Sequence, residues 1–445
     1  MSHAIITTPS PTADPERSAA RPWWLRAMPW LGQPPALTSR QWNVLGVLGA
    51  AALIDNYDLG VLGLALPQIQ TGLGVAEADV GALIAVVRLG VIPALLLTVL
   101  ADRTGRRRLL LATILGFTVC TFLTAFVRSA AEFAALQFLA RVFIAGQGML
   151  AVVVIIEEFD ANVRGWGIGM MGALGSLGHG LAAIIFSVVN LLPFGWRALY
   201  VVGVAPLLLI AWFRRTLSET PRFEYHRTTR ATASGLHAAL QPFRDLVRMY
   251  PGRIVALCAA LLPVAFVFET SLLFASKFLQ EVHHYSPANV AVMYLTIGVL
   301  APIGNVVAGS LGDRFGRKRI MIAGSLVNAG AIAGFYHVAG FWVPLTWGLM
   351  VMTLTMVLVL FAALGGELFP TSYRSTASGV RAVVYTLGAA LGLWVEGQLY
   401  GVVGSHAAAL TLMLIVVPIA PLIIALTLPE TAARELEEIA PERPS

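Results

Sequence analysis

Long apolar runs follow one another along most of this chain, with only short polar segments between them. Each run approaches or exceeds the roughly 20 residues that a helix needs to cross a bilayer. The runs lie at 43–70, 80–100, 109–127, 132–157, 165–191 and 197–213, and then at 253–279, 288–311, 319–338, 342–366, 375–402 and 406–428. Lipid offers no partner to unpaired backbone groups, so such runs fold as helices. The pattern predicts an all-α membrane protein with about twelve transmembrane helices in two six-helix bundles.

Composition supports a bilayer as the solvent of this chain. The 445 residues are 57% hydrophobic and 12% charged, whereas soluble domains are about 25% charged. The net charge of +6 does not indicate a nucleic-acid partner, because the arginines gather in a few short loops. Cys120 and Cys258 both fall inside apolar runs, where buried small side chains are expected. We expect membrane lipid as a partner, a monomer, and neither metal nor cofactor.

The same runs predict five regions along the chain. They are a disordered N-terminal tail at 1–40, a six-helix bundle at 41–214, a central loop at 215–252, a second bundle at 253–428 and a polar tail at 429–445. The first tail lacks the apolar core of a signal peptide.

Arginine and lysine placement predicts the orientation. The loops near 103–108 and 314–319 and the central loop are rich in these residues, and the loops at the other ends of the helices are poor in them. Basic loops stay in the cytoplasm. The chain is therefore expected in a bacterial-type inner membrane, with both tails and the central loop on the cytoplasmic side.

The two bundles repeat one another in sequence. The segment ADRTGRRR begins at Ala101, and GDRFGRKR begins at Gly312, 211 positions later. Glutamate and arginine at 157 and 164 recur at 367 and 374, 210 positions later. Parallel repeats of this kind place a solute site between them, near the middle of the membrane.

These segments resemble the signature motifs of the major facilitator superfamily. The loop motif G-x-x-x-D-R-x-G-R-[RK] fits from Gly309 to Lys318, and its first copy has Thr98 in place of the usual glycine. GELFPTSYR, from Gly366 to Arg374, is similar to a segment of sugar and organic-ion members. The resemblance covers the chain from the first run to the last. It implies secondary active transport by alternating access.

The first apolar run, ALIDNYDLGVLGLALPQI, is similar to the D-[GA]-[FY]-D start of the aromatic-acid and related metabolite:proton symporters. Asn56 replaces the usual small residue, and both aspartates are present. The resemblance implies proton-coupled uptake of a small organic solute.

Two aspartates in the membrane are the candidates for carrying the proton. Asp55 and Asp58 are spaced i, i+3, so they share one face of a helix. Two carboxylates this close and away from water do not both ionise readily, so one is expected to hold a proton near neutrality. The segment Arg141-x-x-x-x-Gly146-x-Gly148 resembles a further motif of the superfamily, and the resemblance implies that Arg141 pairs with this helix. The alternative is a static network in which arginines satisfy both aspartates in every state.

Other ionisable and aromatic side chains within the runs are candidates for substrate contact. A guanidinium grips a carboxylate with two parallel hydrogen bonds, and histidine titrates near neutrality. The alternative for each arginine is to balance an acid on a neighbouring helix, and for the others it is packing. The candidates are Arg88, His179, Glu269, Arg381, Tyr57 and Tyr385.

The repeated loop motifs are expected to act as a gate where the bundles meet in the cytoplasm. A charge bias that only sets the orientation of the chain in the membrane would explain the arginines there but not the acids. The candidates are Asp102, Arg106, Glu157 and Arg164 in the first bundle, and Asp313, Arg317, Glu367 and Arg374 in the second.

Symport of protons with a small organic anion, such as a carboxylate or aromatic acid, is the function that the sequence favours. A proton-coupled sugar or polyol symporter is the nearest alternative. A drug:proton antiporter and a non-transporting receptor are less favoured. An enzyme is not expected, because no Gly-x-Ser-x-Gly, His-Glu-x-x-His or P-loop motif occurs.

Overall fold

Helices make up the secondary structure throughout the described part of the chain. The computed structural model describes residues 35–160, 163–204, 236–370, 373–432 and 439. The first bundle contains α2 (Ser39–Leu64), α3 (Leu66–Leu73), α4 (Glu77–Arg88), α5 (Val91–Thr104), α6 (Arg106–Thr124), α7 (Ala130–Glu158), α8 (Arg164–Phe186), the 3₁₀ turn η3 (Val189–Leu191) and α9 (Trp196–Val202). The second contains α13 (Pro251–Glu281), α14 (Pro287–Thr296), α15 (Leu300–Phe315), α16 (Arg317–His337), α17 (Trp342–Glu367), α18 (Arg374–Val403), α19 (His406–Met413), η5 (Leu414–Val416) and α20 (Ile419–Thr427). The predicted all-α class is confirmed for these residues.

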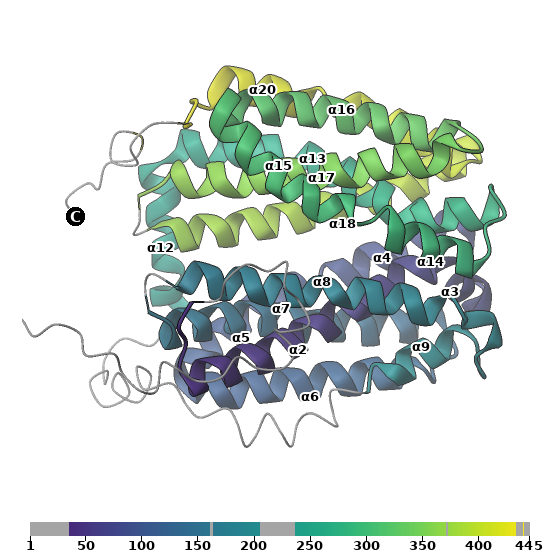
Figure 1. Cartoon of the computed structure of the whole chain (residues 1–445), viewed down its shortest axis with the longest axis horizontal. Coiled ribbons are helices and arrows are strands. Elements are labelled where there is room, and N and C mark those ends of the chain that lie inside the picture. Colours follow the sequence, from purple (N-terminus) through teal and green to yellow (C-terminus); the bar gives the residue numbers. More distant parts are fainter. Residues whose placement is uncertain (1–34, 161–162, 205–235, 371–372, 433–438, 440–445) are drawn as a thin grey trace, which may run out of the picture.

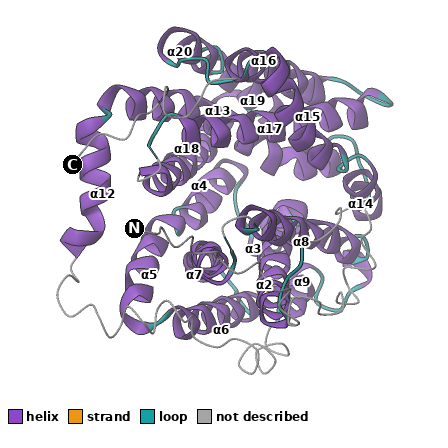
Figure 2. Cartoon of the chain, turned by 60° about the vertical axis from the view of Figure 1, so that its left-hand side comes forward, coloured by secondary structure: helices purple, strands orange, loops and turns teal. Residues whose placement is uncertain are grey.

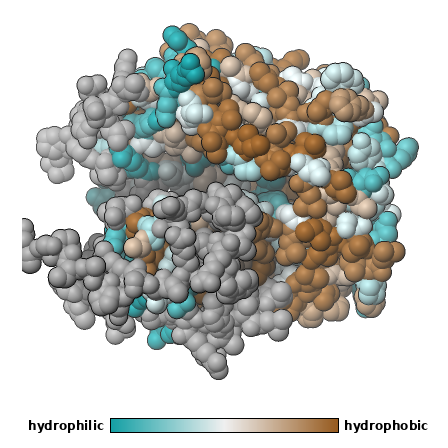
Figure 3. Space-filling view, viewed as in Figure 1, coloured by the Kyte–Doolittle hydropathy of each residue, from teal (hydrophilic) through white to brown (hydrophobic). Residues whose placement is uncertain are grey.

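Eleven spans in the described residues are long and apolar enough to cross a membrane. The remaining expected span, 197–213, begins with α9 and continues into residues outside the described part. Figure 1 shows the first bundle in purple and blue below the second in green and yellow. Hydrophobic side chains cover much of the helical surface between the ends in Figure 3.

Local sequence signals explain where several helices begin. Thr38 and Gln41 form a capping box at the start of α2, because each side chain accepts a hydrogen bond from the other residue's backbone N–H. The turns from α5 to α6 and from α15 to α16 pass through Gly105 and Gly316, whose φ angles are +99° and +98°. Only glycine adopts such a conformation readily. This requirement explains the repeated glycine of the loop motif. We call the end of the helices that carries these two turns the basic end.

Two corresponding spans are broken in the middle. The run 80–100 is α4 followed by α5, with a break at Leu89 and Gly90. Its counterpart 288–311 is α14 followed by α15, with a break around Gly298. A proline follows each break closely, at positions 93 and 302, and proline is tolerated in the first turn of a helix. The repeat therefore extends to the shape of the helices.

The central segment is the main difference from the predicted architecture. We expected a polar loop at 215–252, but α12 (Leu236–Met249) is a helix within it, at the left of Figure 1. Apolar residues at positions 236, 240, 243, 246, 247 and 250 follow helical spacing. Leu246 is buried, whereas Phe243 is 44% exposed. This amphipathic pattern explains why the segment is helical despite its many arginines.

Close packing joins the two bundles at the end away from the basic loops, which we call the opposite end. Figure 2 shows α4 beside α18 and α14 beside α8. A Cβ atom placed on Gly81 of α4 would lie 2.0 Å from the carbonyl oxygen of Leu393 in α18. Ser276 Oγ of α13 donates to the carbonyl oxygen of Leu64 at 2.8 Å, and Gln68 Nε2 donates to Gln280 Oε1 at 2.5 Å. These contacts close the opposite end.

Candidate functional site

An ion pair in the membrane connects the two bundles. Arg88 Nη2, at the last turn of α4, lies 2.8 Å from Glu269 Oε2 of α13. Tyr385 of α18 donates its hydroxyl hydrogen to Glu269 Oε1 at 2.5 Å. The arginine and glutamate side chains are 19% and 17% exposed. Three of the predicted substrate residues thus form one hydrogen-bonded group, in which the two charges neutralise each other.

The candidate proton residues lie in the first bundle. Asp55 and Asp58 of α2 are 7% and 4% exposed. Gln147 Nε2 of α7 donates to Asp55 Oδ2 at 2.7 Å, and Thr121 Oγ1 of α6 donates to Asp58 Oδ1 at 3.3 Å. The second carboxylate oxygen of Asp55 is buried without a partner among the described residues.

Arg141 links these aspartates to the ion pair. Its guanidinium interacts electrostatically with Asp55, Asp58 and Glu269, and it lies near Arg88 as well. The close approach of α4 and α7 explains this placement, because a Cβ atom on Gly90 would lie 3.0 Å from Arg141 Cβ. Arg141 Nε is buried without a hydrogen-bond partner among the described residues. Arg141 is therefore placed between the two aspartates and the ion pair.

His179 and Arg381 lie near the ion-pair group, but neither forms an ion pair with it among the described residues. His179, in the middle of α8, is exposed and interacts electrostatically with Glu269. Arg381 of α18 is partly exposed and lies near the neutral phenol of Tyr385. Within the described residues, no carboxylate forms an ion pair with Arg381. Among the described residues, Arg381 is therefore a cation within a predicted span that no acid neutralises.

Tyr57 lies apart from the other predicted substrate residues. It is 3% exposed, and its hydroxyl donates to the carbonyl oxygen of Leu199 in α9 at 2.8 Å. Successive residues on a helix point about 100° apart, so this side chain leaves the face that Asp55 and Asp58 occupy. Its contacts indicate packing between α2 and α9.

The basic end of the second bundle brings together three of the predicted gate residues. Arg317 Nη2 lies 3.2 Å from Asp313 Oδ1, and the same guanidinium pairs with Glu367. Arg374 instead donates to the carbonyl oxygen of Phe369 at 3.3 Å. In the first bundle, Arg164 likewise donates to the carbonyl oxygen of Phe159, at 2.9 Å. The two arginines therefore hold equivalent backbone turns.

The other gate candidates of the first bundle are less completely described. The side chains of Asp102 and Arg106 lie outside the described part. Glu157 takes part in an interaction at the end of α7.

Glu430 lies at the basic end of the second bundle and was not predicted from the sequence. Its carboxylate accepts hydrogen bonds from the backbone N–H groups of Arg317 and Lys318, at 2.9 and 3.2 Å. A carboxylate is favourable at a helix N-terminus, here that of α16. The repeat carried a signal for it, because LSET at 217–220 recurs as LPET at 428–431, 211 positions later. The first copy lies outside the described residues.

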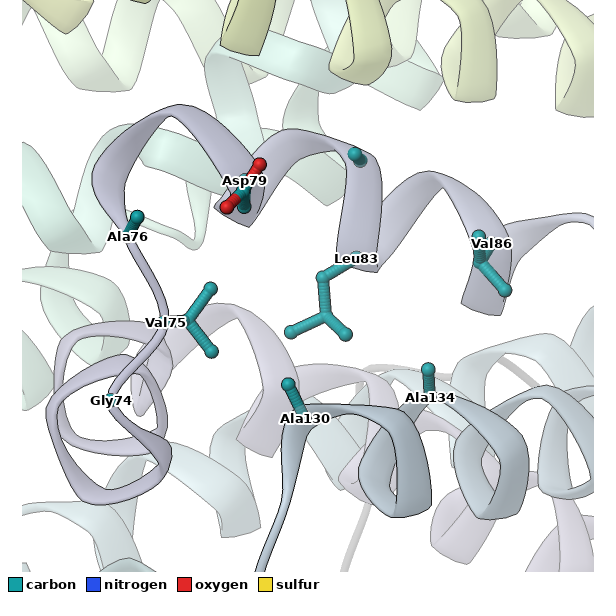
Figure 4. Close-up of a pocket in the computed structure, with 9 residues that line it drawn as sticks. Gly74, Val75, Ala76, Asp79, Leu83, Val86, Ala130 and Ala134 are labelled. Atoms are coloured by element: carbon teal, nitrogen blue, oxygen red, sulfur yellow. The ribbon is translucent and has the colours of Figure 1, made fainter.

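A separate pocket of about 470 Å³ lies at the opposite end of the first bundle. Figure 4 shows Val75, Leu83, Val86 and Ala134 around it, with Asp79 at its edge. Its apolar lining shares no residue with the ion-pair group. We therefore do not assign the substrate to it.

The family model of the Major Facilitator Superfamily matches residues 48–393 and 264–444. The chain belongs to this superfamily. It is 27% identical over 366 residues to a probable 4-methylmuconolactone transporter of Cupriavidus pinatubonensis, covering 78% of this chain and 80% of the relative.

Two further comparisons add detail. The chain is 28% identical over 214 residues to a gallate transporter of Pseudomonas putida, covering 47% of this chain and 46% of the relative. The inward-open xylose transporter XylE of E. coli superposes with a TM-score of 0.72 at 18% identity, covering 90% of this chain and 99% of that one. This likeness shows the fold alone. The protein is thus a multi-pass membrane transporter of the major facilitator fold.

Proposed function

We propose that this transporter takes up a small organic anion together with protons, and that the anion is an aromatic or short carboxylate. The observation that carries the proposal is that Arg381 forms no ion pair with a carboxylate in the part of the chain that the structure describes. Arg88 is already neutralised by Glu269 at 2.8 Å, and we assign Arg141 to the aspartates, so Arg381 is the cation that we assign to the substrate carboxylate. The gallate and 4-methylmuconolactone named for two relatives fit this class of substrate.

Proton coupling rests on Asp55, Asp58 and Arg141. Burial makes two neighbouring carboxylates costly to ionise together, and carboxylates inside a membrane commonly mark proton pathways. Arg141 interacts with both aspartates and with Glu269. A proton arriving at the aspartates would free Arg141 to interact more strongly with Glu269 and so change the group beside Arg381.

The orientation completes the proposal. The basic end faces the cytoplasm, as expected from the positive-inside rule. The gate of Asp313, Arg317 and Glu367 then lies on the inner side of an inner membrane. The contacts at the opposite end would keep the outer side closed while solute leaves to the inside.

Ligand binding to purified Arg381→Ala tests the substrate class. We expect gallate to stabilise the wild-type protein against heat, because a ligand that binds only the folded state raises its stability. Its uncharged amide and xylose should not do so. Arg381→Ala should lose the stabilisation, and Arg381→Lys should retain part of it. Equal stabilisation by the acid and its amide would refute the assignment of Arg381.

A further inference from the structure

A second group of charged side chains lies at the opposite end, where the bundles meet. Lys277 of α13 is 1% exposed, and its Nζ contacts Gln70 Oε1 at 2.5 Å, Glu77 Oε2 at 3.0 Å and Glu281 Oε1 at 2.5 Å. Glu77 begins α4 of the first bundle and also reaches His406 of the second. The group therefore joins the bundles through opposite charges.

The ring of His406 touches a carboxylate oxygen with each of its nitrogens. Nδ1 lies 2.6 Å from Glu396 Oε1, and Nε2 lies 2.9 Å from Glu77 Oε2. The ring is held between Phe274 and Tyr400, with centroids at 4.7 and 4.4 Å. These contacts fix the ring in the plane that serves both acids.

Hydrogen-bond chemistry requires an additional proton in this arrangement. An ionised carboxylate only accepts hydrogen bonds, and a neutral imidazole donates from one nitrogen alone. With both glutamates ionised and His406 neutral, one of the two contacts would join two acceptors. The proton must lie on the ring or on one of the glutamates.

Burial strengthens this requirement. The Glu396 side chain is 0% exposed, and its second oxygen has no partner among the described residues. An isolated buried carboxylate is costly unless it is paired or protonated. Lys277 and Tyr400 also lie near His406. Tyr336 lies near Glu396, and its hydroxyl donates to the carbonyl oxygen of Ser271.

We propose that Glu77, His406 and Glu396 form a second proton-binding site, which is complete only while the opposite ends of the two bundles are closed. Glu77 comes from the first bundle, and the other two come from the second. When the bundles separate, a neutral His406 can still donate to Glu396 and needs no further proton. Closure therefore binds one proton from solution. The inference rests on the proposed function only in that the bundles move relative to each other.

This linkage has a defined size. If closure binds one proton, the ratio of closed to open protein falls about tenfold for each unit of pH increase. The fall is confined to the interval in which the closed site holds the proton and the open site has lost it. Below and above this interval the ratio is constant.

Distance measurements between spin labels test the site without any transported solute. The two native cysteines are first replaced by alanine, and labels are placed at Leu191 and Phe341, which are 84% and 76% exposed and lie at the opposite end of each bundle. Asp55→Asn and Asp58→Asn are included so that the membrane aspartates do not contribute to the titration. The protein in lipid nanodiscs is measured across about pH 5 to 8.

We expect the short-distance population to fall as the pH rises. Glu77→Gln should abolish this dependence while keeping closure, because an amide can either donate to His406 or accept from it. His406→Gln should abolish it too. His337→Gln is the matched control, since His337 is exposed at the same end and contacts Thr411 instead of an acid. A distance distribution that does not change with pH, or one that responds equally in Glu77→Gln, would overturn the proposal.

Discussion

Arg88 Nη2 lies 2.8 Å from Glu269 Oε2, across the boundary between the two bundles. Tyr385 donates to the other oxygen of the same carboxylate. The pair satisfies one arginine and one glutamate within the membrane, and in the proposed function Arg381 is the residue that binds the anion. It also joins α4 to α13, and so the first bundle to the second.

Removing the acid from this pair should destabilise the protein. In Glu269→Gln, Arg88 keeps its charge and loses its ionic partner, which should lower the free energy of unfolding by about 1.5–3 kcal/mol. Thermal unfolding in detergent measures the change. The double variant Arg88→Met/Glu269→Gln removes both charges and should recover part of the loss. An unchanged melting temperature in Glu269→Gln would show that the pair does not stabilise this state.

Small residues at the contact between α4 and α18 should control closure of the opposite end. Gly81→Ala places a methyl group 2.0 Å from the carbonyl oxygen of Leu393, so the helices must move apart. Spin labels at the opposite end should then report longer distances. Gly401→Ala is the control. Gly401 lies on α18, as Leu393 does, and a Cβ atom placed there would meet nothing within 4 Å. Similar distances in both variants would contradict the packing account.

Glu430 should stabilise the basic end of the second bundle. Glu430→Ala removes the acceptor for two backbone N–H groups at the start of α16, and losing such a cap costs about 1 kcal/mol. Asp313→Ala is a suitable comparison, because that side chain is 69% exposed and exposed ion pairs contribute about 0–1 kcal/mol. Hydrogen exchange at the first turn of α16 measures the local effect. A larger change in Asp313→Ala than in Glu430→Ala would argue against this role.

The sequence predicted the fold well, because length and hydropathy of the runs leave few alternatives to helices in lipid. It also named both Arg88 and Glu269, but not their pairing, since contacts between helices far apart in sequence depend on how the bundles dock. Tyr57 shows the limit of spacing arguments: its neighbours Asp55 and Asp58 point one way, and it packs against α9. Glu77 and His406 were missed because each looks like an ordinary helix-end residue until the bundles are brought together.

Proton-driven accumulation of gallate in proteoliposomes tests the central claim most directly. With an inward proton gradient, the wild-type protein should concentrate gallate above its external level, and a protonophore should abolish the gradient-driven part. Asp58→Asn should lose accumulation and retain counterflow exchange, whereas Asp79→Asn, the same change at the edge of the separate pocket, should resemble the wild type. Accumulation that persists undiminished in Asp58→Asn, or that ignores the proton gradient in the wild type, would contradict the account.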